Sequence, residues 1–266
     1  MRIGIFDSGL GGLIIAKAIR RVMPEYDYVY LGDTKRVPYG NRSHEAVYQF
    51  TLEAVEFLFK KENCALIIIA CNTASARALR RIQKNYKNQN KKVLGVLIPA
   101  AEECAKFERI GVLGTRGTVD SNTFPIEIKK FWKSKPAKGR ARVFQNSAPM
   151  LVPLAEEGEV KNALPFIKEY LQPFRNKELD ALVLGCTHYP IFKKQIKKLL
   201  PPNTKLISQD EIVPKKLKDY LKRHQEVTKK LSKNKTARIL VTDMTKSVQK
   251  LTKKWFGNTK PKLVNL

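Results

Sequence analysis

Two apolar runs of strand length, each ending in a cysteine, constrain the fold of this 266-residue chain most strongly. The first covers residues 65–70 and ends at Cys71, and the second covers residues 181–185 and ends at Cys186. Runs that are apolar throughout are typical of strands buried on both faces of a parallel sheet. Small polar residues follow each cysteine, where we expect a helix to begin. The sequence therefore predicts an α/β fold with two thiols at carboxyl ends of strands, where open α/β sheets bind ligands.

The position of the two thiols predicts reactive cysteines. A helix that begins directly after each cysteine offers unpaired backbone N–H groups and the positive end of its dipole. Both features favour the thiolate, so we expect the pKa of each thiol to lie below the roughly 8.5 of a free cysteine. A single thiol at a strand end is more often structural than catalytic, but two in equivalent positions favour a shared function.

Four functions are open to the cysteine pair. Cys71, Cys186 and His188 could bind a metal, but their segments lack the spacing of a zinc site. Cys186 and His188 fit a nucleophile with its base, which would leave Cys71 without a role. A disulfide exchange pair usually has cysteines close in sequence. The fourth function is acid–base chemistry on the two faces of one carbon: one thiolate removes a proton and the other thiol delivers one, which inverts a stereocentre without a metal or cofactor.

The first strand–helix unit has a counterpart in the second half of the chain. Residues 110–115 align with residues 3–8 at nearly the spacing that separates the two cysteines. We interpret this match as two related halves, although coincidence between two α/β units would also explain it. A polar stretch over 87–92 indicates a crossing between domains, and we expect the C-terminal tail to complete the first sheet. The sequence thus predicts two similar, doubly wound domains with mostly parallel sheets, related by a pseudo-two-fold axis: residues 1–92 plus 208–266, and residues 93–207.

Local patterns give further predictions. The glycine-rich turn after the first strand differs in spacing from the dinucleotide fingerprint, so phosphate binding has weak support, and Asp7 and Ser8 could instead cap the next helix. The loop over 32–43 is long enough to be functional. We also expect a strand over residues 93–98, ended by Pro99, and helices over residues 43–61 and 74–86. A basic turn is expected over residues 133–139.

The composition of the chain limits the cellular compartments and the binding partners that we expect for it. With 43% hydrophobic residues the chain can bury a sizeable core. No apolar run approaches the ~20 residues that span a bilayer, and because the N-terminus enters the first strand at once, we expect no signal peptide. Free thiols in a reducing cytoplasm are indicated, because the 4 cysteines form no C-x-x-C pair. The net charge of +27 would suit nucleic acid or anionic ligands, but the basic residues are spread along the helices, so we interpret them as a solvated coat.

Motifs distributed in order over the chain identify a family. They are Phe6-Asp-Ser-Gly-Leu-Gly-Gly12, Gly32-Asp-Thr34, Pro38-Tyr-Gly40, Ala70-Cys-Asn-Thr-Ala74 and Leu184-Gly-Cys-Thr-His-Tyr-Pro190, with the Thr115/Thr118 turn and residues 152–156. From Met1 to about Leu200 the chain resembles the glutamate racemases of the aspartate/glutamate racemase superfamily. The resemblance implies a cofactor-independent enzyme with two α/β domains around a buried cleft, which interconverts L- and D-glutamate and supplies D-glutamate for peptidoglycan.

The resemblance also implies roles for individual residues. Cys71 would act on D-glutamate and Cys186 on L-glutamate. Asp7 would assist Cys71, and His188, with Glu156, would assist Cys186. Asp7 and His188 also match positions that bind the substrate. The other matching positions are Ser8, Tyr39, Gly40, Asn72, Thr73, Thr115, Thr118 and Thr187.

The chain departs from the family pattern at a few points. Ala148 precedes a proline where many members have a cysteine, which removes only a thiol outside the catalytic pair. Residues 208–210 replace an acidic strand end common at this point, and they lie at the connection between the domains. The charge is also more positive than we expect for the family.

Two other readings compete with this one. An aspartate or hydantoin racemase belongs to the same superfamily, but residues 186–190 together with residues 38–40 favour glutamate. A nucleic-acid-binding protein would use the basic surface, yet no aromatic-interleaved basic motif is present, so specific nucleic-acid binding is not expected. We expect glutamate as the substrate, a homodimer, no bound metal or cofactor and no membrane association.

Overall fold

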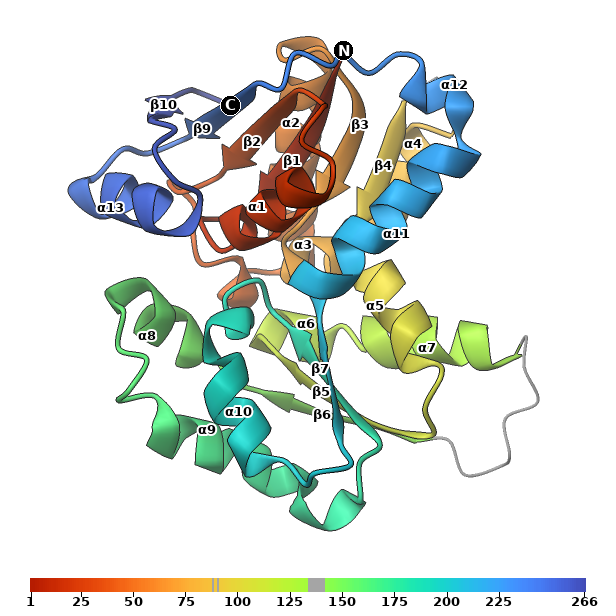
Figure 1. Cartoon of the computed structure of the whole chain (residues 1–266), viewed down its shortest axis with the longest axis vertical. Helices are drawn as coiled ribbons and strands as arrows, with labels where there is room; N and C mark the ends of the chain where they lie inside the picture. Colours follow the sequence, from red (N-terminus) through yellow and green to blue (C-terminus); the bar gives the residue numbers. More distant parts are fainter. Residues whose placement is uncertain (88, 90, 134–141) are drawn as a thin grey trace.

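The computed structural model describes residues 1–87, 89, 91–133 and 142–266 and contains two parallel sheets, one above the other in Figure 1. The larger sheet has six strands, and all of its described pairings are parallel. Its order is β10 (Pro261–Leu263), β9 (Ala237–Val241), β2 (Tyr28–Gly32), β1 (Arg2–Asp7), β3 (Cys64–Ile69) and β4 (Lys92–Gly95). The last two strands of the chain thus lie beside β2, as the sequence predicts for the tail.

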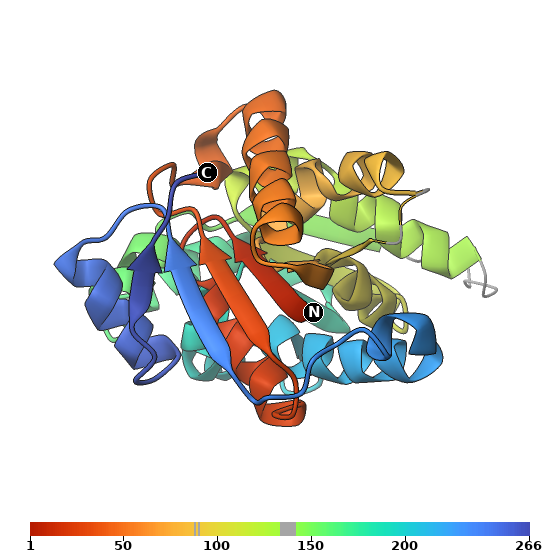
Figure 2. The same cartoon turned by 90° about the horizontal axis from the view of Figure 1, so that it is seen from above.

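Helices cover both faces of this first sheet, as the view from above shows (Figure 2). Side chains alternate along β1: Ile3 and Ile5 face one layer of helices and Phe6 faces the other. The first layer consists of α1 (Gly12–Val22), α11 (Gln209–Arg223) and α13 (Lys246–Trp255), with the short α12 (Gln225–Thr228) after α11. The second layer consists of α2 (His44–Lys60), α3 (Asn72–Arg77) and α4 (Leu79–Asn85), and the 3₁₀ turn η1 (Tyr39–Asn41) precedes it.

The second sheet has four parallel strands, in the order β6 (Arg142–Ser147), β5 (Arg109–Gly114), β7 (Ala181–Gly185) and β8 (Lys205–Ser208). One face packs against α5 (Leu97–Cys104) and α7 (Thr123–Lys133), with α6 (Arg116–Asp120) at the end of β5. The other face packs against α8 (Leu151–Glu157), α9 (Leu164–Leu171) and α10 (Lys193–Leu199). The 3₁₀ turn η2 (Gln172–Lys177) connects α9 to β7, and η3 (Tyr189–Phe192) connects β7 to α10.

The two halves share one topology. The order β2-β1-β3-β4 of the first sheet recurs as β6-β5-β7-β8 in the second. The strand that ends before Cys71 therefore has the same place in its sheet as the strand that ends before Cys186. The predicted fold class, two similar doubly wound α/β domains, is confirmed.

The chain crosses between the sheets twice. After each crossing, the next helix packs on the sheet that the chain has reached. After β4 in the first sheet, α5 packs on the second sheet. After β8 in the second sheet, α11 packs on the first. Because β4 pairs with β3, the predicted boundary at residue 92 falls inside this strand, and the crossing lies at Val96. The remaining domain bounds stay a prediction.

Two local predictions differ from the structure. The apolar run over 93–98 is not one strand: β4 ends at Gly95, and Pro99 lies in the first turn of α5, where a missing N–H costs no hydrogen bond. The helix over 74–86 is divided into α3 and α4 at Ala78. The helix over 43–61 is confirmed, with Ser43 accepting a hydrogen bond at its start. The basic turn over 133–139 lies almost wholly outside the described residues.

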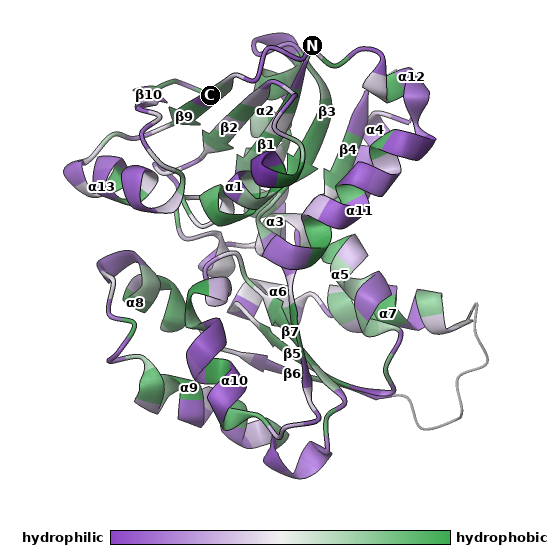
Figure 3. Ribbon diagram, in the orientation of Figure 1, coloured by the Kyte–Doolittle hydropathy of each residue, from purple (hydrophilic) through white to green (hydrophobic). Residues whose placement is uncertain are grey.

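Hydropathy follows this architecture. The strands are mostly hydrophobic, and the helices turn hydrophilic residues outward (Figure 3). Within the described part of the chain, no helix combines the length and the apolar character needed to cross a bilayer.

Candidate active site

The carboxyl ends of the two sheets meet at the junction between the domains. The turn after β1 touches the segment after β7, since a Cβ atom added at Gly11 would lie 2.4 Å from Oγ1 of Thr187 and 2.5 Å from the ring of His188. The segment after β3 touches the segment after β5 through a hydrogen bond of 2.8 Å between the hydroxyls of Thr73 and Thr115. Residues predicted from both halves of the sequence therefore lie together.

Cys71 is the N-cap of α3 and is 6% exposed. Its sulfur accepts hydrogen bonds from the backbone N–H of Ala74, at 3.4 Å, and from the hydroxyl of Ser8, at 3.3 Å. The predicted helix start after this cysteine is confirmed. The thiol is thus held by one contact from its own helix and one from the glycine-rich turn.

The expected lowering of the Cys71 pKa is wrong. Burial, together with the negative charges of Asp7 and Cys186, raises the pKa of this thiol to about 12. The hydrogen bonds from Ser8 and Ala74 act in the opposite direction but are outweighed. The sequence shows the favourable helix start, whereas the loss of solvent and the neighbouring carboxylate arise only in the folded molecule.

Asp7 lies at the end of β1 and is 1% exposed. Its Oδ2 accepts a hydrogen bond of 3.1 Å from the N–H of Gly9, whereas Oδ1 has no hydrogen-bond partner among the described residues. Burial raises the pKa of the carboxyl, and the nearby charge of His188 only partly offsets this effect. Helix α1 has no side-chain cap, so neither Asp7 nor Ser8 has the alternative capping role.

Cys186 forms a chain of contacts with His188 and Glu156. The Nδ1 atom of His188 lies 3.8 Å from the sulfur of Cys186, and its Nε2 atom lies 3.0 Å from Oε1 of Glu156. Burial alone would lower the pKa of His188, but its hydrogen bonds to Cys186 and Glu156 raise it to about 10. The imidazole is therefore protonated at neutral pH and can donate to both partners. This arrangement places a proton donor beside the second thiol.

A tryptophan completes the surroundings of His188. Trp255, at the end of α13, meets the imidazole edge-on with ring centroids 5.5 Å apart. The tryptophan is buried and belongs to the helix layer of the first sheet, so this contact crosses the domain junction. Sequence reasoning missed Trp255, because a tryptophan at helical spacing has the pattern of an ordinary core residue.

Three predicted threonines form one hydroxyl cluster. The Oγ1 atom of Thr115 lies 2.8 Å from that of Thr73 and 3.0 Å from that of Thr118. Thr115 also caps α6 by accepting a hydrogen bond from the N–H of Thr118. Neutral donors and acceptors from both domains thus lie side by side next to Cys71, where they can bind carboxylate groups. Gly40 approaches the same cluster, with Thr115 Cβ 3.3 Å from the place of a Cβ on this glycine.

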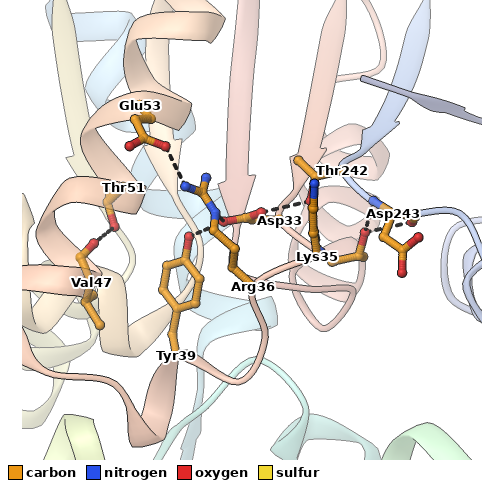
Figure 4. Close-up of polar contacts among 10 residues, drawn as sticks. Asp33, Lys35, Arg36, Tyr39, Val47, Thr51, Glu53, Thr242 and Asp243 are labelled. Atoms are coloured by element: carbon orange, nitrogen blue, oxygen red, sulfur yellow. Dashed lines mark hydrogen bonds and ion pairs between the residues drawn. The ribbon is translucent and has the colours of Figure 1, made fainter. Parts of the chain in front are cut away.

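The loop that carries Tyr39 and Gly40 is held by a buried carboxylate (Figure 4). Asp33 is 0% exposed and accepts hydrogen bonds from the Tyr39 hydroxyl at 2.5 Å, from Arg36 Nε at 2.6 Å and from the Thr242 hydroxyl at 2.8 Å. The Tyr39 hydroxyl thus points to Asp33, and burial raises its pKa. Sequence reasoning quoted Asp33 only within a motif, and its role as the anchor of this loop was missed.

Asn72 and Thr187 complete the set of predicted residues. Asn72 is buried, and its side-chain amide is paired with that of Gln209. Thr187 is 4% exposed and faces Gly11 across the junction. Ala148 is wholly buried, and its carbonyl lies 2.7 Å from the hydroxyl of Tyr189, so this departure from the family pattern lies behind the site. The structure thus joins some of the residues predicted from the sequence directly, namely Ser8 with Cys71, the three threonines with one another, and Cys186 with His188 and Glu156.

The site is built from thiols, an imidazole, carboxyls and hydroxyls. In the described part of the chain, no group of three or more His, Cys, Asp or Glu side chains is placed to hold a metal ion. This arrangement is suited to proton transfer, because it contains two thiols at equivalent strand ends. One thiol lies beside a carboxyl and the other beside a protonated imidazole.

Comparison with known proteins agrees with this chemistry. Residues 14–209 match the family model described as Asp/Glu/Hydantoin racemase. The glutamate racemase of Aquifex aeolicus is 40% identical over 227 residues, which are 84% of each chain, and that of Persephonella marina is 40% identical over 258 residues, 94% of this chain and 92% of the other.

Solved structures agree with the sequence relatives. The glutamate racemase of Francisella tularensis in complex with D-glutamate superposes with a TM-score of 0.88 at 32% identity, over 99% of this chain and 97% of that one. The chain therefore belongs to the aspartate/glutamate racemase superfamily and, within it, to the glutamate racemases, a family of isomerases.

Proposed function

We propose that the protein interconverts L- and D-glutamate by proton transfer between the substrate α-carbon and two cysteines. The observation that carries this proposal is the pair Cys71 and Cys186, each following the equivalent strand of its sheet and each 6% exposed at the junction. The charge of Cys186 acts on the pKa of Cys71, as expected for sulfurs that share one site. Groups on opposite faces of one carbon are what inversion of a stereocentre requires.

The proposed reaction balances with the two thiols alone. In the L-to-D direction, the Cys186 thiolate takes the α-proton, and the Cys71 thiol then delivers its own proton to the opposite face. In the D-to-L direction the roles are exchanged. The raised pKa of Cys71 supports this assignment, because a thiol that holds its proton at neutral pH is ready to deliver it.

Asp7 and His188 are proposed to manage these protons, one at each thiol. Asp7 lies buried beside Cys71, and burial raises the pKa of its carboxyl, so it holds a proton more strongly than an ordinary carboxyl does. His188, held by Glu156, faces Cys186. Under initial-rate conditions we expect Asp7→Asn and His188→Asn to change kcat unequally in the two directions. The ratio of the two kcat/KM values must remain near one, because enantiomers have equal free energies. Unchanged rates in both directions would remove these residues from the mechanism.

Glutamate as the substrate is supported by the relatives and by the chemistry of the site. The Francisella tularensis structure is a complex with D-glutamate. Here the hydroxyls of Ser8, Thr73, Thr115 and Thr118, with the backbone around Gly40, are proposed to bind the two substrate carboxylates by hydrogen bonds. We further propose that the enzyme acts without a cofactor, as a homodimer in the cytoplasm, and that its product enters peptidoglycan synthesis.

One incubation tests the central claim. The protein is mixed with L-glutamate in heavy water, and the α-proton signal is followed by NMR while chiral chromatography follows D-glutamate. We expect the α-proton to disappear as D-glutamate forms, and Cys71→Ser and Cys186→Ser variants to lose racemisation. Racemisation that persists in either variant would exclude the two-cysteine mechanism. L-Aspartate serves as the control substrate, and its faster racemisation would reassign the specificity.

A further inference from the structure

Gln209 stands at the point where the chain crosses back to the first domain. It is the first residue of α11, directly after β8, and lies in the stretch where the sequence departs from the family pattern. Its side chain is 1% exposed. A buried amide must find hydrogen-bond partners, because leaving its polar atoms unpaired is costly. Its partners therefore show what this position does.

The Gln209 amide is paired with the amide of Asn72. Each donates to the other at 2.7 Å, so that two hydrogen bonds join residues 137 positions apart in the sequence. The same Nε2 atom lies 3.5 Å from the carbonyl oxygen of Val96, a longer contact at the other crossing. One side chain thus connects both crossings to the residue that follows Cys71.

The neighbouring residues fix this crossing to the second domain. Lys193, at the start of α10, forms ion pairs with Asp210 at 2.7 Å and with Glu211 at 2.6 Å. The rest of α11 packs on the first sheet. Contacts with both domains therefore fix the position of Gln209. Through its hydrogen bonds with Asn72, Gln209 helps to position the beginning of α3, where Cys71 is the N-cap.

We propose that Gln209 is a positioning residue that couples the domain crossings to the alignment of the Cys71 thiol. The inference rests on the proposed two-cysteine reaction. Proton transfer depends on the distance and direction between sulfur and carbon, and small displacements lower its rate strongly. Cys186 follows β7, and Gln209 forms no hydrogen bond with residues 186–188 in the described part of the chain. Loss of the amide pair is therefore expected to disturb one of the two proton transfers.

The test is Gln209→Met, which keeps the approximate volume of the side chain and removes both hydrogen bonds. Its matched control is Lys193→Met, which removes the ion pairs at the same crossing without touching Asn72. For each protein, kcat/KM is measured in both directions with glutamate carrying hydrogen or deuterium at the α-carbon. Circular dichroism and thermal unfolding check that the variants are folded.

The deuterium isotope effects on kcat/KM, called deuterium effects below, distinguish a positioning role of Gln209 from a general loss of structure. If Cys71 is misaligned, removal of the proton from D-glutamate limits the rate more, so the deuterium effect rises in the D-to-L direction. In the L-to-D direction, slower delivery by Cys71 lets the intermediate return, so the deuterium effect falls. We expect kcat/KM to decrease about tenfold in Gln209→Met, the scale of one lost buried hydrogen bond, and the ratio of the two deuterium effects to change only in this variant.

Two results would overturn the inference: an unchanged ratio in Gln209→Met, or an equal change in Lys193→Met. If Gln209→Met does not fold, Gln209→Glu decides by the same measurement, because its carboxylate can still accept a hydrogen bond from Asn72, and a smaller change of the same sign is expected. Failure of the proposed function would look different, since the unsubstituted protein would then not racemise glutamate.

Discussion

At the scale of single residues, the buried carboxyl of Asp7 predicts a conflict between stability and activity. Burial raises its pKa, so the folded state keeps the proton to a higher pH than the unfolded state does. The folded state therefore loses stability as pH rises from the ordinary carboxyl value of 3.8 through the raised value. Asp7→Asn does not titrate. We expect it to raise the melting temperature at pH 7, with a difference that vanishes as pH falls below the ordinary carboxyl value of 3.8, and to lower kcat about a hundredfold.

Asp27→Asn is the control with the opposite sign. Burial opposes ionisation of Asp27, but hydrogen bonds from Ser232, Thr236 and Asn234 lower its pKa. Its carboxylate therefore stabilises the fold above the ordinary carboxyl pKa, and this stability is lost as pH falls. Asp27→Asn is expected to lower the melting temperature at pH 7 and to leave kcat unchanged. An Asp7→Asn protein that melts below the unsubstituted one at pH 7 would contradict the account of Asp7.

The raised pKa of Cys71 predicts an unusual alkylation profile. The thiolate of a free cysteine is half formed at roughly pH 8.5, so its alkylation rate levels off above about pH 9.5. With a pKa of about 12, the rate of Cys71 alkylation by iodoacetamide should instead rise about tenfold per pH unit from pH 7 to 10 without levelling off. Peptide mass spectrometry after timed labelling follows this one thiol. Ser8→Ala, which removes a hydrogen bond that lowers the pKa, should slow the labelling at every pH. A rate that levels off between about pH 9 and 10 would show that burial does not raise the pKa decisively.

At the scale of elements, the loop over 33–42 is expected to depend on its buried anchor. Asp33→Asn weakens the hydrogen bonds from Tyr39 and Arg36 (Figure 4). Tyr39 precedes Gly40, which lies against Thr115. We expect the free energy of unfolding to fall by about 2 kcal/mol, typical for hydrogen bonds to a buried charge, and KM to rise about three- to tenfold while kcat changes less. Steady-state kinetics and urea unfolding measure the two effects.

A hydroxyl in the same region supplies the control. Thr51 is buried, and its hydroxyl donates to the carbonyl of Val47 within α2 at 2.6 Å, without contact to Asp33. Thr51→Val should cost about 1 kcal/mol or less and leave KM unchanged. Equal KM changes in the two variants would mean that Asp33 has no special part in holding the loop.

The sequence predicts those parts of the fold that depend on short-range patterns. The apolar runs before Cys71 and Cys186 give two equivalent strands, and the motifs after them give the site residues. The same reasoning fails at Val96, because an apolar run continues from a strand into a helix and hydrophobicity alone does not separate them. It also fails for Trp255 and Gln209, whose roles depend on contacts with residues far away in the sequence.

At the scale of the whole molecule, the net charge of +27 includes cations on two helices that lack acidic residues. Neither α1 nor α13 contains an acidic residue, and none of their cations forms an ion pair in the described part of the chain. Helix α13 also carries Trp255, which contacts His188, so its exposed Lys253 and Lys254 lie near the site. The charge thus includes cations placed where they can attract an anionic substrate.

This placement predicts a shallow dependence of catalysis on salt. Exposed charges more than about 10 Å apart are largely screened at roughly 0.1 M salt. We expect kcat/KM to decline modestly from low to high salt while kcat stays constant, and Lys253→Gln/Lys254→Gln to flatten the decline. Lys61→Gln, at the amino edge of the first sheet, is the control, and an uncharged crowding agent corrects for viscosity. A flat profile in the unsubstituted protein would mean that the charge does not assist catalysis.

The first sheet is built from both ends of the chain, which affects its formation on the ribosome. Strand β9 covers the edge of β2, but it is synthesised some two hundred residues later. Until then β2 presents an unpaired edge, the kind of surface that pairs with other nascent chains. The second sheet comes from the continuous segment 109–208 and needs no later strand. We therefore expect the second domain to fold first during translation. The first sheet can be completed only after the tail has been synthesised, and until then we expect chaperones to protect the N-terminal half.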